Sequence, residues 1–436
     1  MDRRKYRFFA FAYAALSKLR ISLIGQLGVN ELLAAIFLIS YQSWKTLFRH
    51  VPNLKNVTAT YLIFLFSQVV SDLVNDSSIN NMARGWANIV MAIIVTVFLA
   101  RLVLRANQNV IYYLIGSVVS ILIFGNVSIG EIDLAEMGFF KFRLVPALNA
   151  LLMVGSWYML KKQPTNRINI VVLFILYGLF NIASDSRSNG IIFIGVALLF
   201  YWKHILPRIT FKKIAPYAIG FLLLCQGLYS LYVYQVLEGK IGGEHTRNQI
   251  TRISNPYNPL NLLVTGRAEV YAGIVAASDR PIFGHGSWAI DKDGKYMFLV
   301  HQLHSEEEKF LDRLRNNDEV LIIPSHSVLV GAWMTSGIIG FGALVFLFSL
   351  FVKCGFNLIT SRYIVASPYF PIVLLFFING FWTFLFSPLS HIRESLPVMV
   401  AFILVLHQKK IYHYKKLAKR KQVTKNSRPV EISGFQ

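Results

Sequence analysis

The sequence predicts an all-α polytopic membrane protein with about twelve transmembrane helices and one large loop. Hydrophobic residues make up 55% of the 436 residues, 15% are charged, and the mean hydropathy is +0.50. Apolar runs of roughly 18 to 22 residues recur, which is the length that a helix needs to cross a hydrocarbon core. This composition excludes a disordered chain and argues against a soluble enzyme. The runs are too long and continuous for barrel strands, so the spans are expected to be helices.

The positive charge of the chain predicts its orientation. The formal net charge is +22, and the C-terminal tail at residues 409–436 is strongly basic. Lys and Arg gather in the cytoplasmic loops of membrane proteins, so this tail is expected in the cytoplasm, contacting anionic lipid and not nucleic acid. The polar stretch at residues 236–326 then falls outside, which is the periplasm of a Gram-negative cell. We therefore expect a multi-pass bacterial inner-membrane protein with both termini in the cytoplasm.

The predicted spans follow the apolar runs in order. They lie near residues 7–19, 30–47, 61–74, 86–104, 110–124, 144–160, 168–182, 190–202, 214–234, 327–351, 368–386 and 396–407. A single early span over residues 21–43 would leave the basic residues at positions 3–7 outside, so two spans are expected there. As a result Lys18 and Arg20 come near the outer face, where their long side chains can snorkel.

The chain divides into four predicted parts. An N-terminal transmembrane bundle covers residues 1–235, and a large periplasmic loop with short helices covers residues 236–326. C-terminal transmembrane helices follow at residues 327–408, before the basic tail at residues 409–436. No internal repeat is visible, which weakens the case for a transporter built from related halves.

No metal site and no cofactor are expected. The two cysteines, Cys225 and Cys354, fall on different spans, so they form no disulfide framework or metal cluster. His301 and His304 precede an acidic run near residues 306–312, but their spacing matches no strong metal-binding pattern. A solvated charged face is the simpler interpretation of that segment.

Arg187 stands in a polar cluster at the outer connection between two predicted spans. Ser186 and Ser188 flank it within residues 184–189, which are all polar. An arginine at a helix end often only snorkels to the interface. The polar surroundings favour a position inside the protein, where a guanidinium fork can hold phosphate oxygens with two hydrogen bonds.

Arg267 marks a second candidate anion site, in the long loop. Gly266 before it lets the backbone approach a ligand closely, and Tyr271 lies four residues later, on the same face of a helix. A helix over residues 267–277, capped by Thr265, would add the anion-binding amides of its N-terminus. A surface ion pair with a neighbouring carboxylate is the simpler alternative.

A glycine-bent turn is predicted after that helix. Residues 281–286 have the sequence PIFGHG, in which proline and two glycines favour a tight turn. His285 in this turn is a candidate substrate contact, with a purely structural role as the alternative.

His326 stands where the loop re-enters the membrane. A histidine can accept a proton from a sugar hydroxyl near neutral pH. Ser325 and Ser327 can cap the helix that follows, and the dipole of that helix favours a developing anion nearby. His391 and Arg393 lie in the last outer loop and therefore on the same side of the membrane.

Four short segments combine into a family pattern. Residues 186–188 give Ser-Arg-Ser, and residues 266–271 give Gly-Arg-x-x-x-Tyr. Residues 281–286 give Pro-x-x-Gly-x-Gly, and residues 326–340 give His-Ser, nine residues and Gly-x-x-Gly. In order, spacing and topology the chain resembles, over roughly residues 60–405, the O-antigen ligase and O-antigen polymerase superfamily of bacterial membrane glycosyltransferases.

The resemblance implies a GT-C-like enzyme that uses an undecaprenyl-diphosphate-linked glycan as donor, at the outer face of the inner membrane. It implies that Arg187 and Arg267 hold the diphosphate leaving group, and that His326 orients or deprotonates the acceptor hydroxyl. General chemistry agrees, because arginine stabilises the charge of a leaving diphosphate without a metal, and the attacking hydroxyl needs a base. The candidate substrate-binding residues are Tyr271, Gly266, His285, Ser186 and Arg393.

The acceptor stays open at this point. A polymerase extends another lipid-linked repeat unit, whereas a ligase attaches the chain to lipid A-core, and no motif separates the two. We favour the polymerase of an O-antigen or exopolysaccharide, because every polymer cluster of this type needs one; a chain-length regulator is then a further candidate partner. A transporter or flippase is the remote alternative, but it should carry ionisable residues deep in several spans, where few lie besides Glu31 and Asp72.

Overall fold

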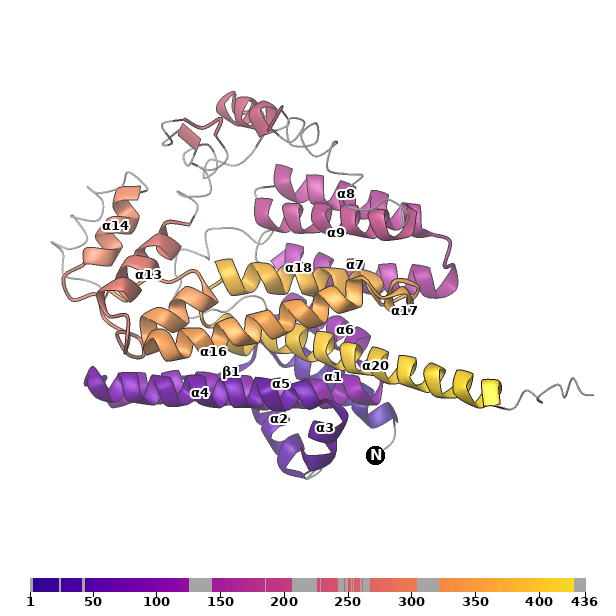
Figure 1. The fold of residues 1–436 in the computed structure, drawn as a ribbon. Coiled ribbons are helices and arrows are strands. Elements are labelled where there is room, and N and C mark those ends of the chain that lie inside the picture. Colours follow the sequence, from indigo (N-terminus) through magenta and orange to yellow (C-terminus); the bar gives the residue numbers. More distant parts are fainter. Residues whose placement is uncertain are drawn as a thin grey trace, which may run out of the picture.

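The computed structural model is almost entirely helical (Figure 1). It describes residues 3–22, 25–40, 44–124, 143–184, 186–205, 226–227, 229–241, 247, 250–251, 253, 255–258, 261, 267–303 and 321–426. The helices before the long loop are α1 Arg3–Ala15, α2 Val29–Ser40, α3 Trp44–His50, α4 Pro52–Val74, α5 Ile79–Arg105, α6 Asn109–Phe124, α7 Val145–Lys162, α8 Arg167–Ala183 and α9 Arg187–Ile205. Those within and after it are α13 Ala268–Asp279, α14 Lys295–Leu303, α16 Val328–Ile359, α17 Arg362–Val365, α18 Phe370–Phe386, α19 His391–Glu394 and α20 Leu396–Asn426.

Helices cover most described residues of the predicted spans, although α1 ends at Ala15, before the predicted end of the first span at residue 19. Most of the span predicted at residues 214–234 lies outside the described residues. Helices α4, α5 and α16 are long and apolar enough to cross a membrane, and α2, α6, α8 and α18 are shorter apolar helices. Local sequence explains several boundaries: Pro52 suits the first turn of α4, and the Ser78 hydroxyl caps α5 by accepting from the Asn81 amide at 3.4 Å. The all-α membrane class is confirmed, whereas the count of about twelve spans and the GT-C likeness stay predictions.

The N-terminal segment forms two helices, as the two-span prediction requires. A hairpin of antiparallel strands, β1 Arg20–Ser22 and β2 Gln26–Gly28, joins α1 to α2. Each helix is short, with 13 residues in α1 and 12 in α2, so neither is as long as a full crossing. Arg20 forms an ion pair with Glu394 of α19 at 3.3 Å. The hairpin therefore lies at the same end of the bundle as the connection that holds His391.

The core of the bundle is built from long helices in layers. Figure 1 shows α4 and α5 along one side, α16 and α20 next to them, α18 beyond, and the α8–α9 pair on the far side. Phenylalanines fill these layers: Phe351 of α16 lies 5.8 Å from Phe384 of α18, and Phe376 of α18 lies 5.4 Å from Phe402 of α20, between ring centroids. Helix α20 continues without a break through the predicted boundary at residue 408, so the start of the basic tail is helical.

A kink divides α16 and explains two of the sequence motifs. Gly337 has φ 73° and ψ −168°, which is non-helical and strongly favours glycine. The 281–286 turn enters this break. The amides of His285 and Gly286 donate to the carbonyls of Met334 (2.7 Å) and Thr335 (3.0 Å), and the Ile338 amide donates to the Ile282 carbonyl (3.3 Å). The turn and the Gly-x-x-Gly segment are therefore one hydrogen-bonded unit.

The turn is also fixed to helix α4. Asp72, fully buried on α4, accepts from the backbone amide and the hydroxyl of Ser287 and from the indole Nε1 of Trp86 (2.8 Å). From the same helix, the hydroxyls of Ser67 and Ser71 donate to the carbonyls of Ser336 and Thr335, each at 2.7 Å. Carbonyls freed by the kink thus find donors on α4, as buried polar groups require.

Candidate functional site

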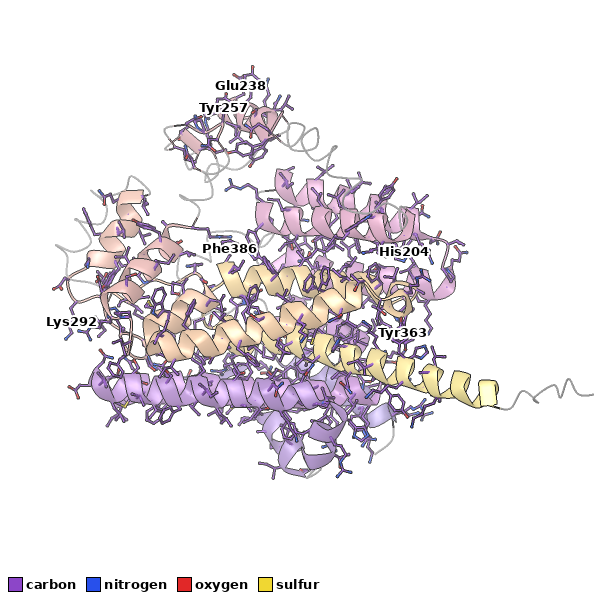
Figure 2. The ribbon with its side chains drawn as sticks, in the orientation of Figure 1. His204, Glu238, Tyr257, Lys292, Tyr363 and Phe386 are labelled. Carbon is purple, nitrogen blue, oxygen red and sulfur yellow. The ribbon has the colours of Figure 1, made fainter. Side chains whose placement is uncertain are left out.

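Arg267 precedes α13 and lies against the end of α18. Its guanidinium carbon is 5.3 Å from the ring centroid of Trp382 and 5.7 Å from that of Phe386, within the range of cation–π attraction. Figure 2 labels Phe386 at the end of α18 that is nearest to α13, and His204 and Tyr363 at the opposite end of the bundle. Burial lowers the pKa of Arg267; Glu269 opposes this effect and Arg187 adds to it. Arg187 and Arg267 are therefore close enough to repel each other.

The local structure around Arg187 is a network of amide side chains. Arg187 begins α9, and the buried Ser186 before it donates its amide to the Asn181 carbonyl at 2.8 Å. Asn189, two residues after Arg187, donates its side-chain amide to the Asn181 side chain (3.0 Å) and to that of Asn149 (3.1 Å). Three helices, α7, α8 and α9, are tied together at this point. The start of α9, and with it Arg187, is held in place by this network.

The start of α16 lies beside the same end of α18. Ser327 caps α16 by accepting from the Val330 amide at 3.3 Å, as predicted, and donates its hydroxyl to the Phe384 carbonyl at 3.3 Å. The Ser325 hydroxyl does not cap the helix; it donates to the Ser327 carbonyl at 3.2 Å. His326 is half-buried between these two serines. The last turn of α18 therefore separates the Arg267 guanidinium, over Trp382 and Phe386, from the start of α16.

His391 is close enough to His326 for the two rings to interact electrostatically. Burial lowers the pKa of His391, Glu394 opposes the effect, and both His326 and Lys18 lower it further. The His391 Nδ1 is 2.9 Å from the Ser395 hydroxyl. The sequence predicts His391 on the outer side but assigns it no role; its proximity to His326 depends on how α19 packs and has no sequence signal.

Arg393 is predicted to bind substrate, but in the structure its partner is the Glu31 carboxylate. Its Nε and Nη2 donate to the two carboxylate oxygens of Glu31, and Nη2 also donates to the Gln26 carbonyl at 2.7 Å. The Glu31 side chain is 3% exposed and also accepts from the Gly28 amide at 2.7 Å. This ion pair clamps the hairpin onto α19. Substrate binding by Arg393 stays a prediction, and its observed contacts are structural.

His285 is held by the backbone of α13. Its Nε2 donates to the Ala276 carbonyl at 2.7 Å, and its ring meets Tyr296 edge to face at 5.8 Å. Burial lowers the pKa of His285. These contacts match the structural alternative, so substrate contact at His285 stays a prediction.

The remaining predicted residues of the long loop fall in and around α13. Tyr271 is 51% exposed, one turn after Arg267. Gly266 and Thr265 lie outside the described residues, and Arg267, which makes no side-chain capping bond, occupies the N-cap position that was assigned to Thr265. Asp279 accepts from Lys295 (2.6 Å) and from the Tyr296 hydroxyl (2.7 Å), so it is engaged away from Arg267. His301 lies in the last turn of α14, whereas His304 and the acidic run lie outside the described residues.

One comparison with known proteins supports the predicted family. Residues 171–345 match the family model described as O-antigen ligase. The predicted superfamily is confirmed. The O-antigen ligase match contains Arg187, Arg267, His285 and His326, and it ends before Arg393. No curated protein matches the chain.

The O-antigen ligase match supports a membrane glycosyltransferase of the ligase and polymerase type, acting on lipid-linked glycans in general. The two acidic residues that a transporter would have needed have other uses here. Glu31 pairs with Arg393, and Asp72 holds Ser287 and Trp86. This arrangement favours a structural role for both carboxylates over the proton relay of a transporter.

Sequence reasoning missed the aromatic residues of α18. Trp382 and Phe386 lie in an apolar run, where aromatic residues are ordinary content of a span. Their spacing of four, at the predicted outer end of that span, was the available signal, because it places both rings on one helix face.

Proposed function

We propose that this chain transfers a glycan from an undecaprenyl-diphosphate-linked donor to an acceptor hydroxyl, at a site facing the periplasm. The observation that carries the proposal is the proximity of Arg187, at the start of α9, to Arg267, directly before α13, which is close enough for the two cations to repel each other. Two like charges in a partly buried setting repel each other. A diphosphate with several negative charges would relieve that repulsion and bind both cations.

The surroundings of Arg267 support a leaving-group site. Trp382 and Phe386 support its guanidinium by cation–π contacts, so the side chain is preorganised. Preorganised cations act most strongly where charge develops in the transition state. Because the guanidinium groups supply the countercharge, the proposed mechanism requires no metal ion.

His326 is the proposed base. It directly precedes the capped start of α16, whose N-terminal dipole favours negative charge nearby. The acceptor oxygen forms its bond to the anomeric carbon while the hydroxyl proton passes to His326. The bond from the anomeric carbon to the diphosphate oxygen breaks, and its electron pair leaves with undecaprenyl diphosphate. Direct displacement of this kind inverts the anomeric centre.

Repeat-unit polymerisation is the favoured form of the reaction, in O-antigen or exopolysaccharide assembly. Ligation of the chain to lipid A-core is the second candidate, because the matching family model is described as O-antigen ligase. Tyr271 and Ser186 are further proposed contacts, since Tyr271 is exposed one turn after Arg267 and Ser186 precedes Arg187.

The test is a gene deletion complemented with single variants and read on a glycan gel. We expect Arg187→Ala, Arg267→Ala and His326→Ala to abolish product at normal protein level, since loss of one such transition-state contact typically costs about 10²–10³ in rate. Lys292→Ala and His50→Ala, at exposed positions, are the matched controls and should retain product. Normal glycan in the Arg267→Ala or His326→Ala strain would sink the catalytic assignment.

The same deletion separates the two acceptors. Single repeat units attached to core, without longer chains, identify a polymerase. Loss of all attached glycan, with lipid-linked polymer accumulating, identifies a ligase.

A further inference from the structure

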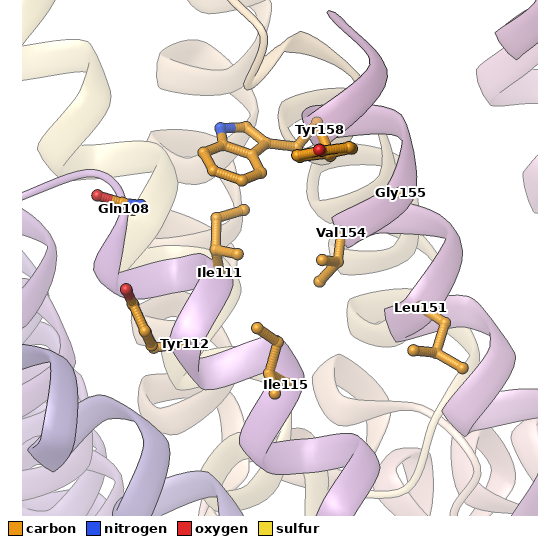
Figure 3. A pocket seen from close by; sticks show the side chains of 9 residues that line it. Gln108, Ile111, Tyr112, Ile115, Leu151, Val154, Gly155 and Tyr158 are labelled. Atoms are coloured by element: carbon orange, nitrogen blue, oxygen red, sulfur yellow. The ribbon is translucent and has the colours of Figure 1, made fainter. Parts of the chain in front are cut away.

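An apolar groove runs between α6 and α7, away from the proposed active site. Its volume is about 420 Å³, within the range of small-molecule sites. Figure 3 shows Ile111 and Ile115 of α6 facing Leu151 and Val154 of α7 across it, while Tyr112, also a lining residue, lies toward the opposite side of α6. Its other lining residues are Gln108, Gly155, Trp157 and Tyr158. Apart from one amide and the polar ends of its aromatic residues, the lining is hydrocarbon.

One end of the groove is ringed by cations. The Arg7 guanidinium donates to the Gln108 side chain at 3.1 Å and lies 5.5 Å from the ring of Tyr112. The ammonium of Lys161 is 4.9 Å from the Trp157 ring, and that of Lys162 is 5.3 Å from the Tyr158 ring. Each of the three cations therefore touches a side chain that lines the groove.

Nothing acidic offsets this charge on the surrounding helices. The sequences of α1, α6 and α7 contain no Asp or Glu. Both lysines are exposed, and the Arg7 Nε has no hydrogen-bond partner among the described residues. The mouth of the groove thus combines hydrocarbon with uncompensated positive charge.

The basic end of the groove lies opposite the proposed active site along the bundle. Lys162 ends α7, and a short connection leads to Arg167 at the start of α8, whereas the other end of α8 leads to Arg187. Gln108 follows α5, whose opposite end joins α4 near the 281–286 turn. By the positive-inside rule this basic end faces the cytoplasmic leaflet, which is rich in anionic lipid.

We propose that the groove is a binding site for an anionic phospholipid of the cytoplasmic leaflet. An acyl chain occupies the apolar space between α6 and α7, and the phosphate contacts Arg7, Lys161 and Lys162. Basic pockets between transmembrane helices on this side of a membrane suit such headgroups. The site is independent of the proposed function, because its occupancy is measured without any glycan donor.

Gly155 offers a direct way to fill the groove. A Cβ at this position would meet no atom within 4 Å, so a larger side chain enters open space and disturbs no packing. Gly342 of α16 is a matched control, because a Cβ there also meets nothing within 4 Å and it does not line the groove. Lys203 is the matched control for charge, since its ammonium lies 4.5 Å from the Trp202 ring, away from the groove.

Native mass spectrometry of the full chain, titrated with phosphatidylglycerol or phosphatidylcholine in detergent, tests the site. We expect phosphatidylglycerol to bind more tightly than phosphatidylcholine. Gly155→Leu should abolish the bound lipid, and the Lys161→Gln/Lys162→Gln double variant should weaken phosphatidylglycerol binding by about 25-fold, at about fivefold for each cation. Gly342→Leu and Lys203→Gln should bind as the wild type does.

Three results would overturn the proposal. The first is that the wild type retains phosphatidylglycerol and phosphatidylcholine equally. The second is that Gly155→Leu retains as much phosphatidylglycerol as the wild type. The third is that an equal concentration of undecaprenyl phosphate displaces phosphatidylglycerol. The last would assign the groove to the polyprenyl chain. A failure of the glycan assay alone would leave this lipid site unaffected, so the two proposals fail separately.

Discussion

Replacing Gly337 by alanine should damage both stability and activity. The residue has φ 73° and ψ −168°, a region essentially restricted to glycine, so an alanine there costs about 1–3 kcal/mol. Its Cβ would also overlap the carbonyl oxygen of Ile282, which accepts from the Ile338 amide. Relief of that overlap weakens this bond and the neighbouring bond from His285 to Met334, at about 0.5–1.5 kcal/mol each. Together the loss is about 2–6 kcal/mol, a large share of the stability of a typical domain.

The measurement is thermal unfolding of the purified full chain in detergent, paired with the glycan gel. Gly342→Ala on the same helix is the control, because its Cβ meets nothing within 4 Å. That variant should be neutral or stabilised by about 0.5–1 kcal/mol, since alanine is favoured over glycine inside a helix. A Gly337→Ala protein with the wild-type melting temperature and a normal glycan pattern would refute the role given to the kink.

Two further predictions concern ionisable groups. Glu31→Gln should destabilise the chain by about 3–5 kcal/mol, because the nearly buried Arg393 loses its counter-charge. Glu394→Gln removes one partner of an exposed ion pair and should cost only about 0–1 kcal/mol. Equal melting temperatures in the two variants would contradict this prediction. Burial lowers the pKa of His285, so the folded chain binds fewer protons than the unfolded chain, and stability should fall as pH drops below the ordinary value of 6.5. The melting temperature of His285→Gln, measured from pH 7.5 to pH 5, should fall less than that of the wild type, and identical slopes would exclude the effect.

The positions of the helices were accessible from sequence, whereas their contacts were not. Apolar runs and basic connections located α4 to α9, α16, α18 and α20, because a segment in lipid must be an uninterrupted helix and charged residues favour the connections in water. The pairing of Arg393 with Glu31 joins opposite ends of the chain and depends on how the hairpin packs against α19. Residue type alone suggested a phosphate ligand there, because a guanidinium fits phosphate and carboxylate equally well.

In the candidate site, too, the sequence predicted the residues but not the contacts between them. Motifs selected Arg187, Arg267 and His326, and the contacts around α18 now explain how two of these regions come together. The Trp382 and Phe386 contacts to Arg267 had only a weak signal, their spacing of four, because aromatic side chains are common in every span. The proximity of His391 to His326 likewise depends on tertiary packing.

The spacing between the His-Ser and Gly-x-x-Gly motifs determines how His326 is oriented in this fold. Nine residues separate Ser327 from Gly337, and they form the short first half of α16, roughly 14 Å long at about 1.5 Å per residue. One end of this half-helix is fixed by Ser327 to the Phe384 carbonyl, and the other by the 281–286 turn, which is anchored on Asp72. Each inserted residue would rotate one end against the other by about 100°, so His326 would leave its place beside His391. The number of residues between His326 and Gly337 therefore determines the orientation of His326, the proposed base. The 281–286 turn fixes that orientation relative to the rest of the bundle.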